Sequence, residues 1–135
     1  NRAVNSILSA YARNARNQNI QVKMDVKLAD GLAVRDIDWI AILANAFENA
    51  IHGCVDSGKM DREISIYIAE KGNKVIIQFC NTSTCDINFR KGLPVSDKGS
   101  GLGVPSIIKT ASRYDGQTDF SLKNEKFVTR ILLNM

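Results

Sequence analysis

The stretch Asn45-Ala46-Phe47-Glu48-Asn49-Ala50-Ile51-His52 decides the fold, because it places polar side chains on one side of an otherwise apolar segment. At about 100° per residue, the side chains of a helix divide into two arcs. The polar arc holds Asn45, Glu48, Asn49 and His52. The opposite, apolar arc holds Leu43, Phe47, Ala50, Ile51 and Cys54. The pattern predicts a helix that buries one face in a core.

The polar arc of this helix is a row of neutral hydrogen-bond donors and acceptors. Asn45 and Asn49 lie one turn apart, and His52 follows one turn later. Carboxamide oxygens suit Mg²⁺ when a charged ligand, such as a triphosphate, lies beside them. A solvated helix face with two incidental asparagines would give the same pattern. The residues of this stretch alone leave both interpretations open.

The composition is typical of one globular domain, with 135 residues, 44% apolar and 24% charged. The net charge of +4 is modest, and no block of Lys or Arg predicts a nucleic-acid surface. Cys54, Cys80 and Cys85 have no paired spacing, which argues against a zinc site and fits a reducing cytosol. No apolar run approaches the length that spans a bilayer, so we expect no membrane contact by this segment.

Hydrophobic periodicity predicts the elements and their order. Helical spacing predicts helices over residues 2–17, from an Asp36 or Asp38 cap to residues 54–56, and over residues 104–114. Alternation predicts strands over residues 20–28, 63–70, 73–79, 117–122 and 127–133. Together they predict an α/β fold, a two-layer sandwich of a mixed five-stranded sheet with about three helices on one face.

Residues 81–100 contain no periodic segment, which predicts a functional loop or a lid over residues 82–98. The lid leads into Lys98-Gly99-Ser100-Gly101-Leu102-Gly103, which opens the last helix. Glycines let a backbone approach a bulky anion, and the start of a helix presents N–H groups and partial positive charge. A P-loop would need Gly-Lys-Ser/Thr, and a dinucleotide fingerprint would need a βαβ unit. Neither pattern is present.

The Asn-x₃-Asn helix, the hairpin that ends at Asn81, the lid and the Gly-x-Gly-Leu-Gly turn together resemble one family. This is the GHKL (gyrase, chaperone, histidine kinase, MutL) ATP-binding family with the Bergerat fold, over roughly residues 20–135. The chain is most similar to the catalytic ATP-binding domain of sensor histidine kinases, of the peptide-pheromone and citrate/malate-type subgroup. The resemblance implies ATP and Mg²⁺ as cofactors, and transfer of the γ-phosphate to a histidine.

The same resemblance implies roles for individual residues. Asn49 matches the Mg²⁺-binding asparagine, and Asn45 lies where ATPases of the family carry a glutamate that activates water. His52 lies where many kinases have Lys or Glu near the phosphates, and Arg90 or Lys91 would be the lid cation. Gly99, Gly101 and Gly103 match the second glycine box, and Lys98 and Leu102 beside them are further candidates for binding the cofactor.

The chain departs from the family at the first glycine box, which is usually Asp-x-Gly-x-Gly. Here the segment reads Cys80-Asn81-Thr82-Ser83-Thr84-Cys85, with Asn81 at the Asp position and no glycine. An Asn can still accept a hydrogen bond from the adenine amine. The peptide-pheromone subgroup shows a similar loss.

His52 is the only histidine and lies in the nucleotide helix, so the acceptor histidine must lie outside this chain. The resemblance implies an upstream dimerisation domain, with residues 1–18 as the end of the connection and residues 19–135 as the catalytic domain. Residues 2–17 could instead be a capping helix of this domain. The expected parent is a homodimeric, membrane-anchored sensor with this domain in the cytoplasm and a response regulator as its downstream partner.

Three other functions fit parts of the pattern. A GHKL ATPase would need a glutamate at position 45, and Glu48 is off register. A serine kinase of the anti-sigma type would also be expected to carry a base. The altered segment around Asn81 fits a degenerate nucleotide-binding module.

Overall fold

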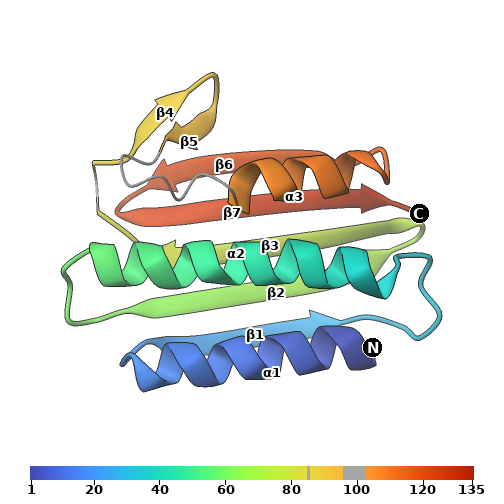
Figure 1. The fold of residues 1–135 in the computed structure, drawn as a ribbon, viewed down its shortest axis with the longest axis horizontal. Helices are drawn as coiled ribbons and strands as arrows, with labels where there is room; N and C mark the ends of the chain where they lie inside the picture. The colour runs from blue at the N-terminus through green and yellow to red at the C-terminus, as the bar shows by residue number, and fades with distance from the viewer. Residues whose placement is uncertain (85, 96–102) are drawn as a thin grey trace.

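The computed structural model describes residues 1–84, 86–95 and 103–135. Figure 1 labels its elements in chain order. They are α1 (Arg2–Asn17), β1 (Gln21–Lys27), α2 (Asp36–Asp56), β2 (Glu63–Lys71), β3 (Lys74–Thr82), β4 (Asn88–Arg90), β5 (Leu93–Val95), α3 (Gly103–Ser112), β6 (Gln117–Lys123) and β7 (Lys126–Asn134). All eight elements that periodicity predicted are confirmed, with boundaries that move by a few residues.

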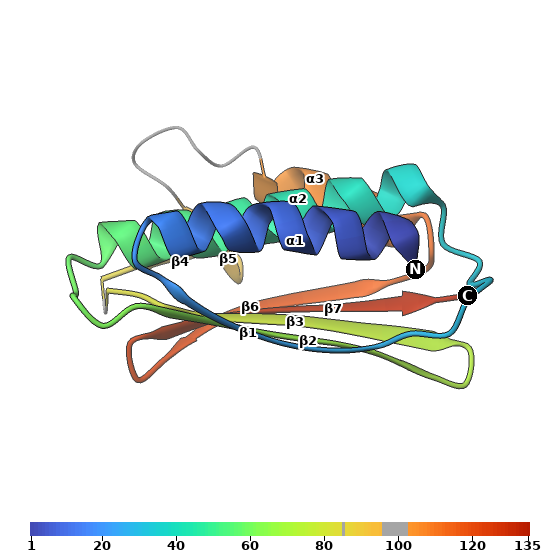
Figure 2. The same ribbon diagram turned by 90° about the horizontal axis from the view of Figure 1, so that it is seen from below.

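The main sheet has five strands in the order β1-β2-β3-β7-β6. β1 runs parallel to β2, and the other neighbours are antiparallel, so the sheet is mixed as predicted. Figure 2 shows α1, α2 and α3 together on one side of this sheet. The predicted two-layer α/β sandwich is therefore confirmed.

The core lies between the helix layer and the sheet, with α2 at its centre (Figure 1). The apolar arc of α2 is buried as predicted, and the Phe47 ring packs edge-on against Phe79 of β3 at 5.5 Å between centroids. α1 joins the same core through one buried stripe: Val4, Leu8, Ala12 and Ala15. The polar arc of α2 consequently points away from the sheet, toward the surface and the neighbouring helices.

Two local predictions were wrong. Arg35 occupies the N-cap position of α2 and makes no side-chain cap, because Asp36 is already helical and Asp38 is buried against α3. Residues 81–100 were expected to lack regular structure, yet they contain the short hairpin β4–β5. Its turn, Lys91-Gly92, has positive φ at both positions, as a two-residue hairpin turn requires. Strands of three residues are too short for alternation to be recognised.

Candidate functional site

The polar arc of α2 divides between its two neighbouring helices. Asn45 and Asn49 are half-buried on the α3 side. Glu48 turns the other way and accepts a hydrogen bond from the Tyr11 hydroxyl of α1, at 2.7 Å. This hydrogen bond, burial and the Glu48 charge raise the pKa of Tyr11 to about 12. The two asparagines therefore form a separate group that faces the start of α3.

Asn45 and Asn49 meet Gly103, the first residue of α3. A Cβ at position 103 would lie 3.1 Å from Asn49 Oδ1, 3.3 Å from Asn49 Nδ2 and 3.5 Å from Asn45 Oδ1. Asn45 Nδ2 donates to Ser106 Oγ at 3.1 Å and to the Ala41 carbonyl at 2.7 Å. The Asn45 amide nitrogen is thus occupied by hydrogen bonds within the protein. The carboxamide oxygens of Asn45 and Asn49 both lie beside the N-terminus of α3.

This junction fits a metal-bound polyphosphate. The first N–H groups of a helix have no acceptor within it and favour an anion, and a carboxamide oxygen is a ligand that Mg²⁺ accepts. The first turn of α3 contains no acidic side chain. Pro105 lacks an N–H, but it lies in the first turn, where that donor is not needed by the helix. Because Gly103 has no side chain, the space beside the two asparagine side chains stays open.

A second polar region lies further along α2, where the helix passes over the end of β3. Asn81 is only 3% exposed, and its Nδ2 donates to the Thr82 carbonyl at 2.9 Å. A Cβ at position 53 would lie 2.4 Å from that nitrogen, so Gly53 is what allows the Asn81 amide to fit beneath the helix. With the nitrogen bound to Thr82, the Asn81 oxygen is the group that can accept from a ligand.

Buried hydroxyls extend this polar region beyond Asn81. Thr82 Oγ1 accepts from the Glu63 N–H at 3.0 Å and from Lys126 Nζ at 3.3 Å. The Ser83 N–H donates to the Glu125 carbonyl at 2.9 Å. Asn81 itself pairs with Ile64 of β2 and Phe127 of β7, so residues 81–83 are fixed by their neighbours.

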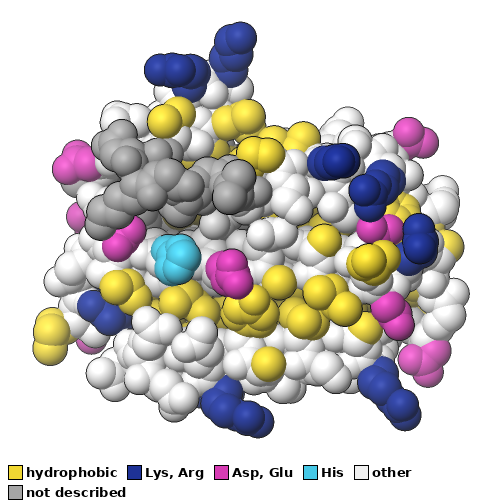
Figure 3. Space-filling model, in the orientation of Figure 1, with side chains coloured by type: hydrophobic (Ala, Val, Ile, Leu, Met, Phe, Trp, Pro, Cys, Tyr) yellow, Lys and Arg dark blue, Asp and Glu magenta, His cyan; other side chains and the backbone are white. Residues whose placement is uncertain are grey.

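His52 and the two lid cations lie at the surface. His52 is exposed on α2, and Figure 3 shows the histidine on the face that carries the helices. Arg90 and Lys91 are exposed at the turn of the β4–β5 hairpin, which points away from α2 in Figure 1. In this arrangement neither Arg90 nor Lys91 accompanies the two asparagines. Their predicted role near the phosphates stays a prediction.

Four predicted site residues, Lys98, Gly99, Gly101 and Leu102, lie outside the described residues, as do residues 85, 96 and 97 of the predicted lid. Gly103 is the member of the second glycine box that the structure describes. The residues that sequence reasoning missed are Gly53 and Ser106. Gly53 has a role only because it lies against Asn81, and Ser106 only because it accepts a hydrogen bond from Asn45. Neither neighbour can be recognised from the local sequence.

Asp38 forms a further cluster at the opposite end of the α2–α3 contact. Asp38 is 2% exposed, and its carboxylate accepts from Arg113 Nη1 at 3.0 Å and from the Tyr114 hydroxyl. The Tyr114 hydroxyl in turn accepts from the Arg35 N–H at 3.1 Å. Burial and the bond to Asp38 raise the pKa of Tyr114, which keeps its hydroxyl a donor.

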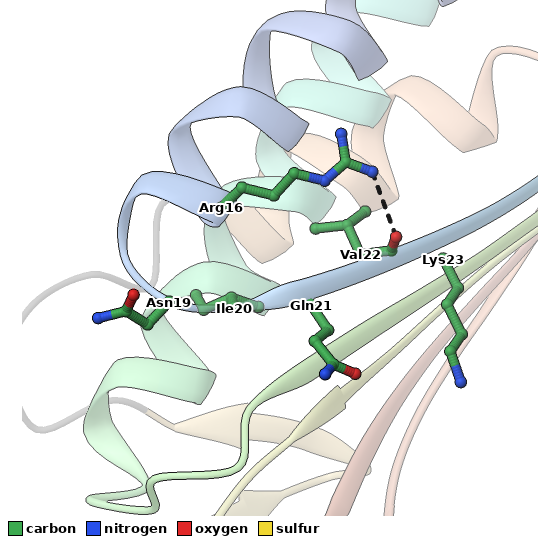
Figure 4. A pocket seen from close by; sticks show the side chains of 6 residues that line it. All are labelled: Arg16, Asn19, Ile20, Gln21, Val22 and Lys23. Carbon is green, nitrogen blue, oxygen red and sulfur yellow. Dashed lines mark hydrogen bonds between the residues drawn. The ribbon is translucent and has the colours of Figure 1, made fainter.

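A separate hollow of about 550 Å³ lies where α1 turns into β1 (Figure 4). Its lining consists of Arg16, Asn19, Ile20, Gln21, Val22 and Lys23. The Arg16 guanidinium donates to the Val22 carbonyl at 3.3 Å, and so links α1 to the edge strand β1. None of the predicted site residues lines this hollow, and we do not assign the nucleotide to it.

Within the described ranges, no group of three His, Cys, Asp or Glu side chains is placed to hold a metal ion. The Asn49 carboxamide belongs to a different donor class from those side chains. In the same ranges, no helix combines the length and apolar character needed to cross a membrane.

Comparison with known protein families matches residues 34–134 to the GHKL domain. The chain belongs to the GHKL domain family. The match includes both asparagines, Asn81 and Gly103, so the site described above lies within the family region. The expected GHKL ATP-binding fold is thereby confirmed at the level of the family.

Solved structures of histidine kinases share the fold. The catalytic domain of histidine kinase ThkA (TM1359) has a TM-score of 0.78 at 15% identity, covering 99% of this chain and 91% of that one. The mycobacterial sensor histidine kinase MprB gives 0.67 at 13% identity, covering 98% and 93%. Full-length ShkA in complex with AMPPNP gives 0.73 at 12% identity, covering 97% of this chain and 29% of that chain. Comparison with curated proteins finds no match. The chain therefore resembles histidine kinase catalytic domains in fold.

Proposed function

We propose that this chain is the ATP-binding catalytic domain of a two-component sensor histidine kinase. It would bind Mg·ATP and transfer the γ-phosphate to a histidine on a separate dimerisation domain. The observation that carries the proposal is the approach of the Asn49 and Asn45 carboxamides to Gly103 at the start of α3. The fold likeness to ShkA, which was solved with AMPPNP, supports the choice of nucleotide.

Each half of the site would bind one half of the nucleotide. Asn49 would hold Mg²⁺, and the N–H groups that begin α3 would receive phosphate, with Lys98, Gly99, Gly101 and Leu102 completing the cradle. The bound Mg²⁺ would neutralise charge on the phosphates during transfer. Asn81 would accept from the adenine amine through its oxygen, because its nitrogen already donates to Thr82. His52 and a lid cation, Lys91 or Arg90, would approach the phosphates from the surface.

The identity of residue 45 favours transfer over hydrolysis. A carboxamide cannot take a proton from water, so Asn45 offers no general base for hydrolysis. Its nitrogen is also engaged by Ser106 and Ala41. A neutral imidazole needs no base to act as a nucleophile. The geometry thus supports a kinase better than a GHKL ATPase or an anti-sigma-type serine kinase.

The acceptor would belong to a longer parent protein. Residues 1–18 would connect to its dimerisation domain, although α1 also packs on α2 as part of the core. The parent would be a membrane-anchored homodimer with this domain in the cytoplasm, acting on a response regulator. We further propose that the parent belongs to the peptide-pheromone and citrate/malate-type subgroup, because the end of β3 carries Asn81 and no glycine.

The alternative of a degenerate nucleotide-binding module is motivated by that same segment. It predicts nucleotide binding that is weak or lost, and no transfer to histidine. A binding measurement therefore separates it from the kinase.

The test is ligand-induced stabilisation of the chain and of Asn49→Ala. Mg·ATP should raise the melting temperature of the wild type, because a ligand that binds only the folded state stabilises it. Without ligand, Asn49→Ala should have a melting temperature close to that of the wild type. With Mg·ATP, it should lose most of the increase in melting temperature that the wild type shows. Asn5→Ala, which removes an exposed asparagine from α1, is the matched control and should keep it. An undiminished rise in Asn49→Ala would contradict the metal role.

A further inference from the structure

α3 contacts α2 through polar groups at both of its ends. At its N-terminal end, Gly103 approaches Asn49, and Ser106 accepts from Asn45. At its C-terminal end, Arg113 and Tyr114, which directly follow the helix, bind Asp38 in the first turn of α2. The first contact lies in the proposed nucleotide site, and the second lies about 15 Å away along a ten-residue helix.

The Asp38 cluster is built to fix one geometry. The carboxylate is buried, so it depends on both partners, and a buried charge that loses a partner is costly. The Tyr114 hydroxyl also accepts from the Arg35 N–H, and the Tyr114 carbonyl accepts from the Asn134 N–H of β7 at 3.0 Å. The end of α3 is therefore held against α2 and the sheet together.

We propose that Asp38 is a positioning residue for the nucleotide site, and that its bonds to Arg113 and Tyr114 set the placement of Gly103 over Asn49. A short helix moves as a rigid element, so a change at one end displaces the other. The approach at Gly103 leaves little room, since a single Cβ would already crowd the Asn49 amide. Metal and phosphate binding at this junction would tolerate little displacement.

The inference rests on the proposed function and makes a narrower claim, because Asp38 touches neither end of the nucleotide. Loss of the cluster would shift α3 and with it the metal–phosphate half of the site. The adenine half at Asn81 would remain in place, because β2 and β7 hold it. Loss of the cluster should therefore reduce the contribution of Mg²⁺ to ATP affinity and leave the contribution of the adenine ring unchanged.

The experiment measures the dissociation constant of ATP by calorimetry, once with Mg²⁺ and once with EDTA. The constant in EDTA divided by the constant in Mg²⁺ gives the contribution of the metal, and this ratio is compared between variants. The variants are Asp38→Asn, Arg113→Met and Tyr114→Phe, each at a temperature at which the single buried tryptophan, Trp39, reports a folded chain. Tyr11→Phe is the matched control, because it also removes a tyrosine hydroxyl that donates to a carboxylate of α2, but from α1.

We expect the ratio to fall about threefold to tenfold in the three variants and to stay at the wild-type value in Tyr11→Phe. Should Asp38→Asn fail to fold, Arg113→Met answers the question, since the Arg113 side chain is 55% exposed. A wild-type ratio in Arg113→Met and Tyr114→Phe, or an equal fall in Tyr11→Phe, would overturn the positioning role alone. A wild type that binds ATP no better with Mg²⁺ would overturn the proposed function as well.

Discussion

One glycine begins α3 and another follows it, and their neighbours predict different effects of an alanine substitution. A Cβ at Gly103 would meet the Asn49 side chain, which can move, at 3.1 Å. A Cβ at Gly116 would meet the Leu132 carbonyl oxygen at 2.3 Å and the Ala111 carbonyl oxygen at 2.7 Å. These backbone atoms cannot move unless the strand β7 or the helix α3 moves with them. The same substitution should therefore affect binding at one position and folding at the other.

Gly103→Ala should weaken Mg·ATP binding with little change in stability. The folded state should lose little, because the added Cβ would meet side-chain atoms of Asn49 and not backbone. Displacement of the Asn49 amide would remove its oxygen from the proposed metal position. Urea unfolding and calorimetric titration with Mg·ATP check the two halves of this expectation. Wild-type affinity in a folded Gly103→Ala would exclude this contact from the site.

Gly116→Ala should lower the free energy of unfolding by about 3 kcal/mol, because overpacking against fixed backbone forces β7 and α3 apart. The Gly116 N–H also donates to the Ala111 carbonyl at 3.0 Å, so the chain leaves α3 through this residue. Urea unfolding followed by Trp39 fluorescence measures the loss. A change as small as that of Gly103→Ala would mean that α3 and β7 can separate without cost.

Among the elements, the link between α1 and α2 depends on Tyr11. Its ring stacks on Phe47 at 5.6 Å, and its hydroxyl donates to Glu48. The folded state raises the pKa of Tyr11 from 10.0 to about 12, so folding favours the protonated phenol. This stabilisation is complete below pH 10 and is lost as the pH rises toward 12, because the unfolded chain ionises first.

We expect the free energy of unfolding to fall between pH 10 and 12 more steeply in the wild type than in Tyr11→Phe. All other titratable side chains are the same in both proteins, so the difference between the two slopes isolates Tyr11. Urea unfolding at several pH values provides the slopes. Parallel profiles would show that the Tyr11–Glu48 bond does not distinguish the folded from the unfolded state.

The elements that sequence predicted are those with a local signal. Periodicity specifies α2 and the long strands because each buries a complete face, and the same helical spacing brings Asn45 and Asn49 together. The hairpin β4–β5 was missed because it buries almost nothing. Asp38 was taken for a helix cap because its partners, Arg113 and Tyr114, are 75 and 76 residues away. Pairings of that kind depend on how the helices pack, which no local pattern encodes.

At the scale of the whole molecule, one helix layer on one sheet places both halves of the proposed site on α2. Asn45 and Asn49 meet α3 near the middle of the helix, and Gly53 meets Asn81 one turn later. A nucleotide lying along α2 would therefore reach the metal, phosphate and base contacts at once. The proposed site lies in the helix layer, which Figure 2 shows on one side of the sheet.

The proposed site should favour transfer of phosphate to a histidine over hydrolysis of ATP. The isolated chain should bind ATP weakly and hydrolyse it very slowly, yet phosphorylate the histidine-bearing dimerisation domain of its parent when that domain is supplied. Asn81 keeps an acceptor for the adenine amine but loses the charge of an aspartate, which could cost about 1 kcal/mol of affinity. Asn45 provides no base for water, whereas an imidazole is already nucleophilic.

Labelled ATP distinguishes the two reactions when it is incubated with the chain alone and then with the dimerisation domain in trans. Transfer of label to a histidine, with little phosphate released by the chain alone, is the expected outcome. Asn45→Glu is the informative control, because a carboxylate at this position would supply the missing base and should raise phosphate release relative to transfer. Rapid release by the unmodified chain without any labelled histidine would favour an ATPase and contradict the kinase.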